Sequence, residues 1–143
     1  MAYKVPASPG LAHDRDPETF VGIEYPLKRG DTVDGYFAST TTTLQAAKTN
    51  VKMLLETSRG ERLMQPQLGT GLRRFLFEQM SDELRILIEN DIMDTFAKWL
   101  PFLTVVDITI NMANNTNTLD ISISFGLTGN PGATTSVAVS IGE

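Results

Sequence analysis

Residues 54–78 read LLETSRGERLMQPQLGTGLRRFLFE, and this stretch decides how the rest of the chain is organised. The segment predicts the end of one helix, an irregular loop and the start of a second amphipathic helix. Gly60 stands where a helix that ends here takes a left-handed residue, and Pro66, Gly69 and Gly71 restrict the path of the loop beyond it. The loop carries charged and amide side chains but neither a nucleophile nor a metal cage. Its residues therefore favour docking a partner over making or breaking a bond.

The length and composition of the chain are typical of one globular domain. With 143 residues, 41% of them hydrophobic, the chain is long enough to enclose a single core. We expect one domain spanning residues 1–143, with residues 1–19 as an extended N-terminal arm. The net charge of −5 and the isoelectric point near 4.8 argue against a nucleic-acid partner, because neutralising phosphates requires an excess of Lys and Arg.

Other functional classes are disfavoured by what the sequence lacks. No apolar run approaches the length that spans a bilayer, and residues 1–6 lack the apolar stretch of a secretory signal. The absence of cysteine excludes disulfides and thiolate chemistry, and the single histidine, His13, leaves little room for a His-based metal site or triad. We expect no cofactor, no metal ion, and neither a membrane nor a small-molecule substrate as a partner.

The first half of the chain predicts two extended pieces followed by helices. Residues 20–27 and 36–38 are short apolar segments separated by a turn at residues 31–35. A helix over residues 42–57 follows, with several threonines available as its N-cap. Its apolar stripe has helical spacing; the stripe consists of Leu44, Ala47, Val51, Leu54 and Leu55.

A short helix over residues 72–78 and a longer one, capped by Ser81 or Asp82 and ending near Leu100, complete the helical part. Pro101 ends the long helix because it lacks an N–H group. The side chains expected in the core repeat at helical spacing; they are Leu84, Leu87, Ile88, Ile92, Phe96 and Trp99, with Ile86 and Met93 widening the stripe.

The C-terminal part predicts three antiparallel strands with alternating apolar side chains and turns at residues 114–117 and 129–132. The apolar positions are Val106, Ile108, Ile110 and Met112 in the first strand, Leu119, Ile121, Ile123, Phe125 and Leu127 in the second, and Val137, Val139 and Ile141 in the third. We predict an α+β fold: an irregular N-terminal segment, two main helices with a short one between them, and a small antiparallel β-meander covered on one face by helices.

The third strand raises the question of how the edge of the sheet is protected. Edge strands are usually blunted by charged residues or proline, and residues 137–141 contain neither. One interpretation is that the N-terminal segment covers this edge. The other is that a strand of another chain adds to it, in which case Val137, Val139 and Ile141 lie at the binding site.

The acidic and basic side chains near the central loop have two interpretations. Glu61 and Arg62 are either a surface ion pair of low energy or a device that presents Arg62, together with Arg59, to a carboxylate or carbonyl group of a partner. A pair of carboxylates could also cleave a glycosidic bond, but a solvated surface is the favoured explanation because no spacing places two of them across a cleft. The carboxylates considered are Glu56, Glu61, Glu78, Asp82 and Glu83.

Three stretches of the chain together resemble a known family. They are Phe20-x-Gly22-Ile23 with Pro26-Leu27; Val51 followed by Leu54-Leu55-x-Thr57-x-x-Gly60-Glu61-Arg62-x-Met64-x-Pro66-x-Leu68-Gly69-x-Gly71-Leu72; and Phe77-Glu78. From about residue 20 to residue 127 the pattern resembles the baseplate wedge proteins of contractile-tailed phages. This family comprises the gene-product-twenty-five, W and TssE proteins and shares a domain with the IraD anti-adaptors. The family motif often reads Glu-Pro-Arg, whereas Glu61 and Arg62 are adjacent here.

The resemblance implies a structural role in the baseplate of a contractile tail. It places the loop residues Glu61, Arg62, Pro66, Gly69 and Gly71 against the helical core bundle of the wedge. It further implies that the small sheet exchanges strands with sheath subunits, so that the protein initiates sheath polymerisation. The implied partners are other wedge proteins and sheath subunits.

Two alternatives remain at this point: a tail-associated lysozyme and a regulatory binding domain of the IraD type. The resemblance implies a location in the baseplate of a virion assembled in the host cytoplasm, or in the cytoplasm if the machine is a secretion system. The adjacent genes distinguish the regulatory domain from the baseplate role, because sheath, tube and spike genes lie near a baseplate gene.

Overall fold

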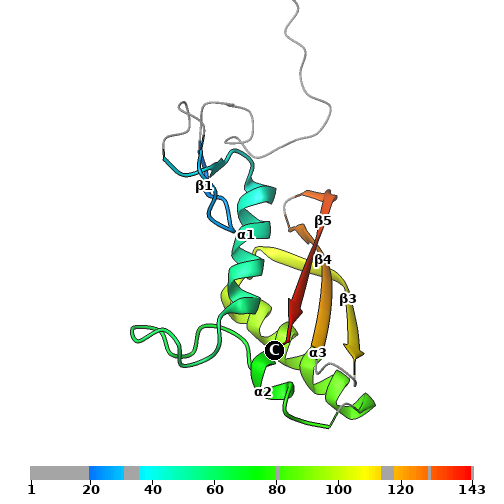
Figure 1. The fold of residues 1–143 in the computed structure, drawn as a ribbon. Helices are drawn as coiled ribbons and strands as arrows, with labels where there is room; N and C mark the ends of the chain where they lie inside the picture. The colour runs from blue at the N-terminus through cyan, green and yellow to red at the C-terminus, as the bar shows by residue number, and fades with distance from the viewer. Residues whose placement is uncertain (1–19, 31–35, 80, 114–117, 129, 143) are drawn as a thin grey trace, which may run out of the picture. The chain divides into compact units, whose positions relative to one another are not determined.

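The computed structural model describes residues 20–30, 36–79, 81–113, 118–128 and 130–142. It confirms the predicted α+β class, with helices and an antiparallel sheet in the expected order (Figure 1). The chain divides into two compact units, residues 1–47 and 48–143. The expected arm at residues 1–19 and the turns at 31–35 and 114–117 lie outside the described residues, and the single domain over 1–143 stays a prediction.

The first unit contains a small two-stranded sheet. β1 (Gly22–Ile23) pairs antiparallel with β2 (Ser39–Thr40) in the register Gly22 to Thr40. The pairing extends beyond these strands through the N–H of Glu24, which donates to the carbonyl of Ala38 at 2.9 Å. The two predicted extended pieces are therefore the arms of one antiparallel ribbon.

The first and third helices begin and end close to their predicted bounds, whereas the short second helix ends at Phe75, three residues before its predicted end. The helices are α1 (Thr43–Glu56), α2 (Leu72–Phe75) and α3 (Asp82–Trp99). Thr42 Oγ1 accepts the N–H of Gln45 at the start of α1, and Ser81 Oγ accepts the N–H of Leu84 at the start of α3. Both contacts are N-caps, which satisfy backbone donors that the first turn of a helix leaves unpaired.

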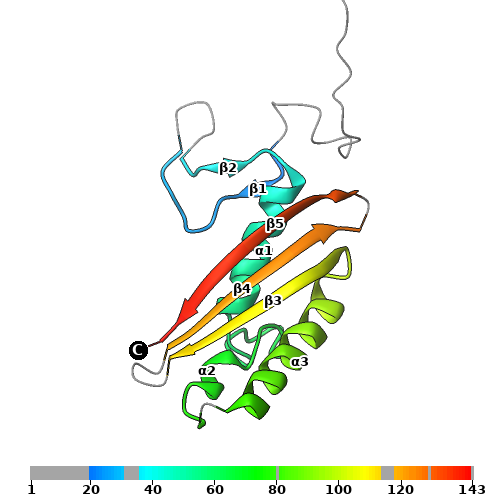
Figure 2. The ribbon, with the colours of Figure 1, turned by 90° about the vertical axis from the view of Figure 1, so that its right-hand side faces the viewer.

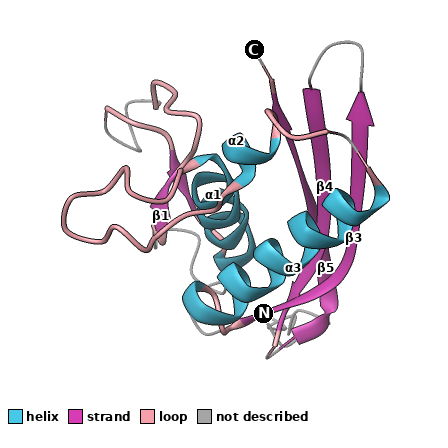
Figure 3. Ribbon diagram, turned by 90° about the horizontal axis from the view of Figure 1, so that it is seen from below, coloured by secondary structure: helices cyan, strands magenta, loops and turns pink. Residues whose placement is uncertain are grey.

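The second unit is organised around a three-stranded sheet in the order β3–β4–β5, antiparallel throughout. The strands are β3 (Leu103–Ala113), β4 (Thr118–Leu127) and β5 (Asn130–Ile141). Helical segments cover one face of this sheet (Figures 2 and 3). The fully buried centre of the unit is formed mainly by β4 and the facing helices; it includes Val51, Leu55, Leu72, Ile88, Ile92, Leu119, Ile121, Ile123 and Phe125.

The predicted inward side of β4 is confirmed, but the predicted side of Val106 in β3 is wrong. Val105 pairs with Phe125 and Asp107 pairs with Ser124, so Val106 is an extra residue in a β-bulge. A bulge shifts the alternation by one residue, and Val106 is accordingly 64% exposed. Simple alternation along the sequence does not reveal such a shift.

Leu87 was also expected in the core, and this was wrong because it is 54% exposed. The face of α3 that packs inward runs through Leu84, Ile88, Ile92 and Phe96. Ile86 and Met93 do not extend this packed stripe, since they are 58% and 46% exposed. A helix against a single sheet buries one stripe, and residues beside that stripe remain in contact with solvent.

Two further boundaries differ from expectation. The turn predicted at residues 129–132 is shorter, because β5 already begins at Asn130 and pairs there with Leu127; residue 129 itself is outside the described part. Gly60 has the positive φ that was expected, 88°, but it lies beyond the end of α1 at Glu56. It therefore belongs to a turn in the loop and does not terminate the helix.

Candidate docking loop and sheet edge

The loop between α1 and α2, residues 57–71, is here named the docking loop. Its two ends run side by side: the N–H of Thr70 donates to the Thr57 carbonyl at 2.9 Å, and the N–H of Arg59 donates to the Thr70 carbonyl at 3.2 Å. The buried Thr70 Oγ1 donates to the Leu55 carbonyl at 3.0 Å. These contacts close the base of the loop against the last turn of α1.

Gly69 is required for this closure. Its φ of +111° is one that side chains rarely adopt, and a Cβ atom added there would lie 2.3 Å from the Thr57 carbonyl oxygen. Gly60 also has a positive φ, but a Cβ atom there would meet nothing within 4 Å. The two ends of the docking loop can therefore approach each other only because residue 69 has no side chain.

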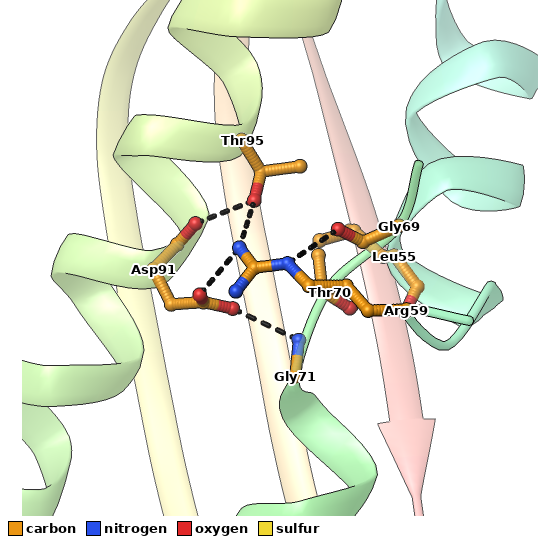
Figure 4. Close-up of polar contacts among 7 residues, drawn as sticks. All are labelled: Leu55, Arg59, Gly69, Thr70, Gly71, Asp91 and Thr95. Atoms are coloured by element: carbon orange, nitrogen blue, oxygen red, sulfur yellow. Dashed lines mark hydrogen bonds and ion pairs between the residues drawn. The ribbon is translucent and has the colours of Figure 1, made fainter. Parts of the chain in front are cut away.

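A charged network fastens the docking loop to α3 (Figure 4). Arg59 Nη2 lies 2.6 Å from Asp91 Oδ1 and 3.2 Å from Thr95 Oγ1, while Arg59 Nε donates to the Gly69 carbonyl at 3.3 Å. The second oxygen of Asp91 accepts the N–H of Gly71 at 2.9 Å. One carboxylate thus binds both ends of the loop, and the guanidinium group fills the space between them.

The network uses the half-exposed guanidinium group of Arg59 for contacts within the chain, although the sequence suggested that Arg59 is presented to a partner together with Arg62. Sequence reasoning missed Asp91 and Thr95. The signal for both was present, because they interrupt the apolar stripe of α3 at positions next to Ile88, Ile92 and Phe96. A polar residue inside a buried stripe needs a polar partner, and here that partner is Arg59.

Glu61 and Arg62 behave differently from each other. Glu61 Oε2 accepts the N–H of Ser58 at 2.9 Å, and the N–H of Glu61 donates to the Ser58 carbonyl at 3.1 Å. Glu61 therefore holds the turn that follows α1, and within the described residues it makes no ion pair with Arg62. Arg62 is exposed and lines a groove of about 240 Å³ with Met53, Leu68 and Trp99.

The tip of the docking loop projects apolar side chains into solvent. Leu63 is 96% exposed and Met64 is 95% exposed. The backbone beneath them is nevertheless ordered by hydrogen bonds, because the N–H of Gly60 donates to the Pro66 carbonyl at 2.8 Å. Pro66 also lines a second groove, of about 360 Å³, that includes Lys98 and Trp99. An exposed apolar tip on a held backbone is a feature of binding surfaces.

The other predicted site, the β5 edge, is also open among the described strands. β5 pairs with β4 on one side, and no strand of the described part pairs with its other side. Val137 and Val139 are 3% and 5% exposed, so their side chains pack inward and only the backbone edge is available. The structure places Pro131 inside β5, which fits an edge strand because proline cannot donate to a central ladder.

The carboxylates that could cleave a glycosidic bond are not gathered in one groove. Glu61 is used in the docking loop, whereas Asp82 and Glu83 lie exposed in the first turn of α3. Of the three grooves described, one contains Glu56, one contains Asp94 and one contains no carboxylate. No cluster of metal-ligating side chains occurs in the described part of the chain. No helix in that part has the length and apolar character to cross a membrane.

The fold and these two surfaces define a small α+β protein with features suited to binding other proteins. The sequence profile described as baseplate wedge protein gp25 matches residues 42–132. The chain belongs to this family, and it is a member of the class of contractile-tail baseplate proteins.

Several solved structures share the fold of this chain. A proposed tail lysozyme of Geobacter sulfurreducens superposes with a TM-score of 0.63 at 20% identity, covering 72% of this chain and 93% of that one. A chain of the type VI secretion system baseplate complex gives a TM-score of 0.58 at 14% identity, over 69% and 92%. A chain of the anti-feeding prophage baseplate gives 0.56 at 20%, over 82% and 81%. Curated protein sequences give no match.

Removing the carboxylate of Asp91 tests the network. Asp91→Ala leaves the Arg59 guanidinium and the Gly71 N–H without their acceptor, and we expect a loss of about 1–3 kcal/mol in the free energy of unfolding, reduced by the partial exposure of Arg59. Urea denaturation measures the loss, and amide exchange at Thr70 and Gly71 should become faster. The matched control is Asp94→Ala, one turn along the same helix and exposed, with an expected change within about 0.5 kcal/mol. Equal stability of the two variants would contradict the assigned role of Asp91.

Proposed function

We propose that this protein is a structural component of the baseplate wedge that docks on the helical core bundle through its docking loop and initiates sheath polymerisation through the β5 edge. The observation that carries the proposal is the combination of a loop fixed at its base, with an exposed tip, and a sheet whose edge strand β5 has no partner on its outer side among the described strands. Membership of the baseplate wedge family supports it.

The docking loop has the physical properties of a preorganised binding element. Binding costs less when a loop is already held in its bound conformation, and the Arg59–Asp91 pair together with Gly69 holds this loop. Arg62 and the apolar tip at Leu63 and Met64 are the exposed groups that a partner would cover. Arg62 supplies a planar set of donors for a carboxylate or a carbonyl group.

The roles of the remaining loop residues follow from their geometry. Glu61 orders the turn that presents Arg62, and Pro66 accepts the Gly60 N–H that closes the loop tip. Gly69 allows the loop base to close, and Gly71 joins that base to Asp91. Of the five residues expected to contact the core bundle, Arg62 is thus proposed as the main contact, and the others as residues that position it.

The β5 edge supports sheath initiation because strand addition requires an unpaired strand. An incoming strand gains main-chain hydrogen bonds along the edge. The inward side chains of the incoming strand would continue the apolar layer to which Val137, Val139 and Ile141 belong. The outward residues Ser136, Ala138 and Ser140 carry no charge that would oppose the pairing.

A non-enzymatic role is favoured over the lysozyme alternative. The similar fold of the proposed tail lysozyme, at 20% identity, is a likeness of fold and does not transfer an activity. Glycoside cleavage by the usual route needs two carboxyl groups flanking the bond, and none of the described grooves is lined by two. No observation favours the regulatory binding domain over the baseplate role.

Arg62→Ala is expected to reduce incorporation of the protein into baseplates sharply while the isolated chain stays folded. An exposed arginine contributes little to stability, whereas losing a charge pair that becomes buried at an interface costs about 2–5 kcal/mol. Circular dichroism tests the fold, and quantification of the protein in purified particles tests assembly. Arg85→Ala, an exposed arginine on α3, is the control and should assemble normally. Normal assembly of the Arg62 variant would refute the docking role.

Proline substitution along β5 is expected to block sheath growth. Successive N–H groups of an edge strand alternate between the paired side and the open side, so Val139→Pro and Ala138→Pro remove donors on opposite sides. The variant that loses the open-side donor should fold and assemble a baseplate that carries no sheath, because proline also obstructs an incoming strand. Electron microscopy of assembled tails is the measurement. Full-length sheath on both folded variants would exclude strand addition at this edge.

The purified chain is expected to have no muramidase activity. Turbidity of a peptidoglycan suspension, followed with a known muramidase as the positive control, measures this directly. Cleavage that disappears when a single carboxylate is neutralised, for example in Glu56→Gln or Asp94→Asn, would establish the lysozyme alternative instead.

A further inference from the structure

β5 ends beside α2 (Figures 1 and 3), and residues at the end of β5 and in α2 line a groove. Its volume is about 430 Å³. It is lined by the end of α1, by α2 and the turn after it, and by the last residues of β5 and the residue beyond them; the lining residues are Glu56, Arg73, Leu76, Phe77, Ser140, Ile141 and Gly142. All of them belong to the second unit.

The apolar part of the groove includes side chains that are in contact with solvent. Phe77 is 84% exposed. Ile141 is half-buried, whereas Val137 and Val139, which precede it on the same side of β5, are 3% and 5% exposed. The inward side chains of β5 are therefore buried at Val137 and Val139 and less covered at Ile141, where the groove begins.

A fourth strand added to the open side of β5 would restore this cover. Side chains of neighbouring strands that lie directly opposite each other point to the same face of a sheet. The residue of the added strand opposite Ile141 would therefore point toward the helices, as Ile141 does. At that position the helix-facing space is the groove beside Leu76 and Phe77.

We propose that the groove is a side-chain pocket that selects the strand added to β5, by accepting one large apolar side chain opposite Ile141. This inference rests on the proposed strand addition and deepens it, since it names the chemistry that the incoming strand must carry. A large apolar side chain there would be covered by Leu76, Phe77 and Ile141, whereas a small polar side chain would leave these three side chains in contact with solvent. Main-chain pairing accepts any sequence, and the pocket supplies the specificity and the register.

The absence of cysteine from the chain allows the register of a test strand to be fixed by a disulfide. Ala138→Cys places a single thiol on the outward, exposed face of β5, outside the groove. The probes are synthetic peptides of alternating threonine and valine with one cysteine and lysines at both ends. Leucine or serine is placed three residues before or three residues after the cysteine, so that both strand directions are tested.

The fraction of protein captured as the mixed disulfide, at fixed peptide and 2-mercaptoethanol concentrations, measures how well each peptide fits. In one strand direction the leucine peptide should be captured about ten- to a hundredfold more favourably than the serine peptide, as expected for burying one leucine side chain. Phe77→Ala should abolish most of this preference. Phe102→Ala, which removes another exposed aromatic ring outside the groove, should leave it unchanged.

The possible results separate this inference from the strand addition on which it rests. Protection of β5 amides from hydrogen exchange in the captured complex, with equal capture of leucine and serine peptides, would overturn the pocket and leave strand addition in place. Capture without any protection of β5 amides would overturn strand addition itself. A leucine preference that persists in Phe77→Ala would show that the groove is not its origin and would also overturn the proposal.

Discussion

The ion pair between Arg59 and Asp91 is the interaction on which the arrangement of the docking loop depends. A loop of this length has a large conformational entropy, and its exposed tip offers few contacts that could oppose that entropy. Asp91 is 14% exposed and lies on α3, a helix that packs against the sheet. Through this one carboxylate the loop is tied to that helix.

The same pair explains why the two arginines of the loop have different uses. Arg59 is 46% exposed yet uses its guanidinium group for Asp91, Thr95 and Gly69. Arg62, three residues later, extends from the turn that Glu61 holds. Arg59 thus orders the backbone through side-chain contacts within the chain, whereas Arg62 is exposed without such a contact among the described residues.

The three-stranded sheet combines a central strand that is paired on both sides with an edge strand that is paired on one side. β4 is central and its inward side chains are almost fully buried, whereas β5 has a strand partner on one side within the described part. A sheet of three strands protects its core with helices but leaves its edges unpaired. An open edge is a risk of aggregation, and in the proposed function it is an assembly surface. In the proposed function, the docking loop recognises its partner through side chains and the β5 edge recognises its partner through the backbone.

The sequence by itself determined the elements of this fold and their order. Helical spacing located α1 and α3, strict alternation located β4, and the Gly- and Pro-rich segment located the docking loop. These features are local, because each depends on residues a few positions apart. The family was also recognisable from the loop motif and its flanking residues.

Tertiary structure decided which side chains in those elements are used internally. The bulge at Val106 reverses the side on which a valine lies, and only the pairing with β4 reveals it. The roles of Arg59, Asp91 and Thr95 depend on contacts between residues 32 and 36 positions apart, at distances that no local pattern encodes. The groove at the end of β5 likewise joins segments from α1, α2 and β5. Such sites arise where distant segments meet in space, and for that reason only the folded chain shows them.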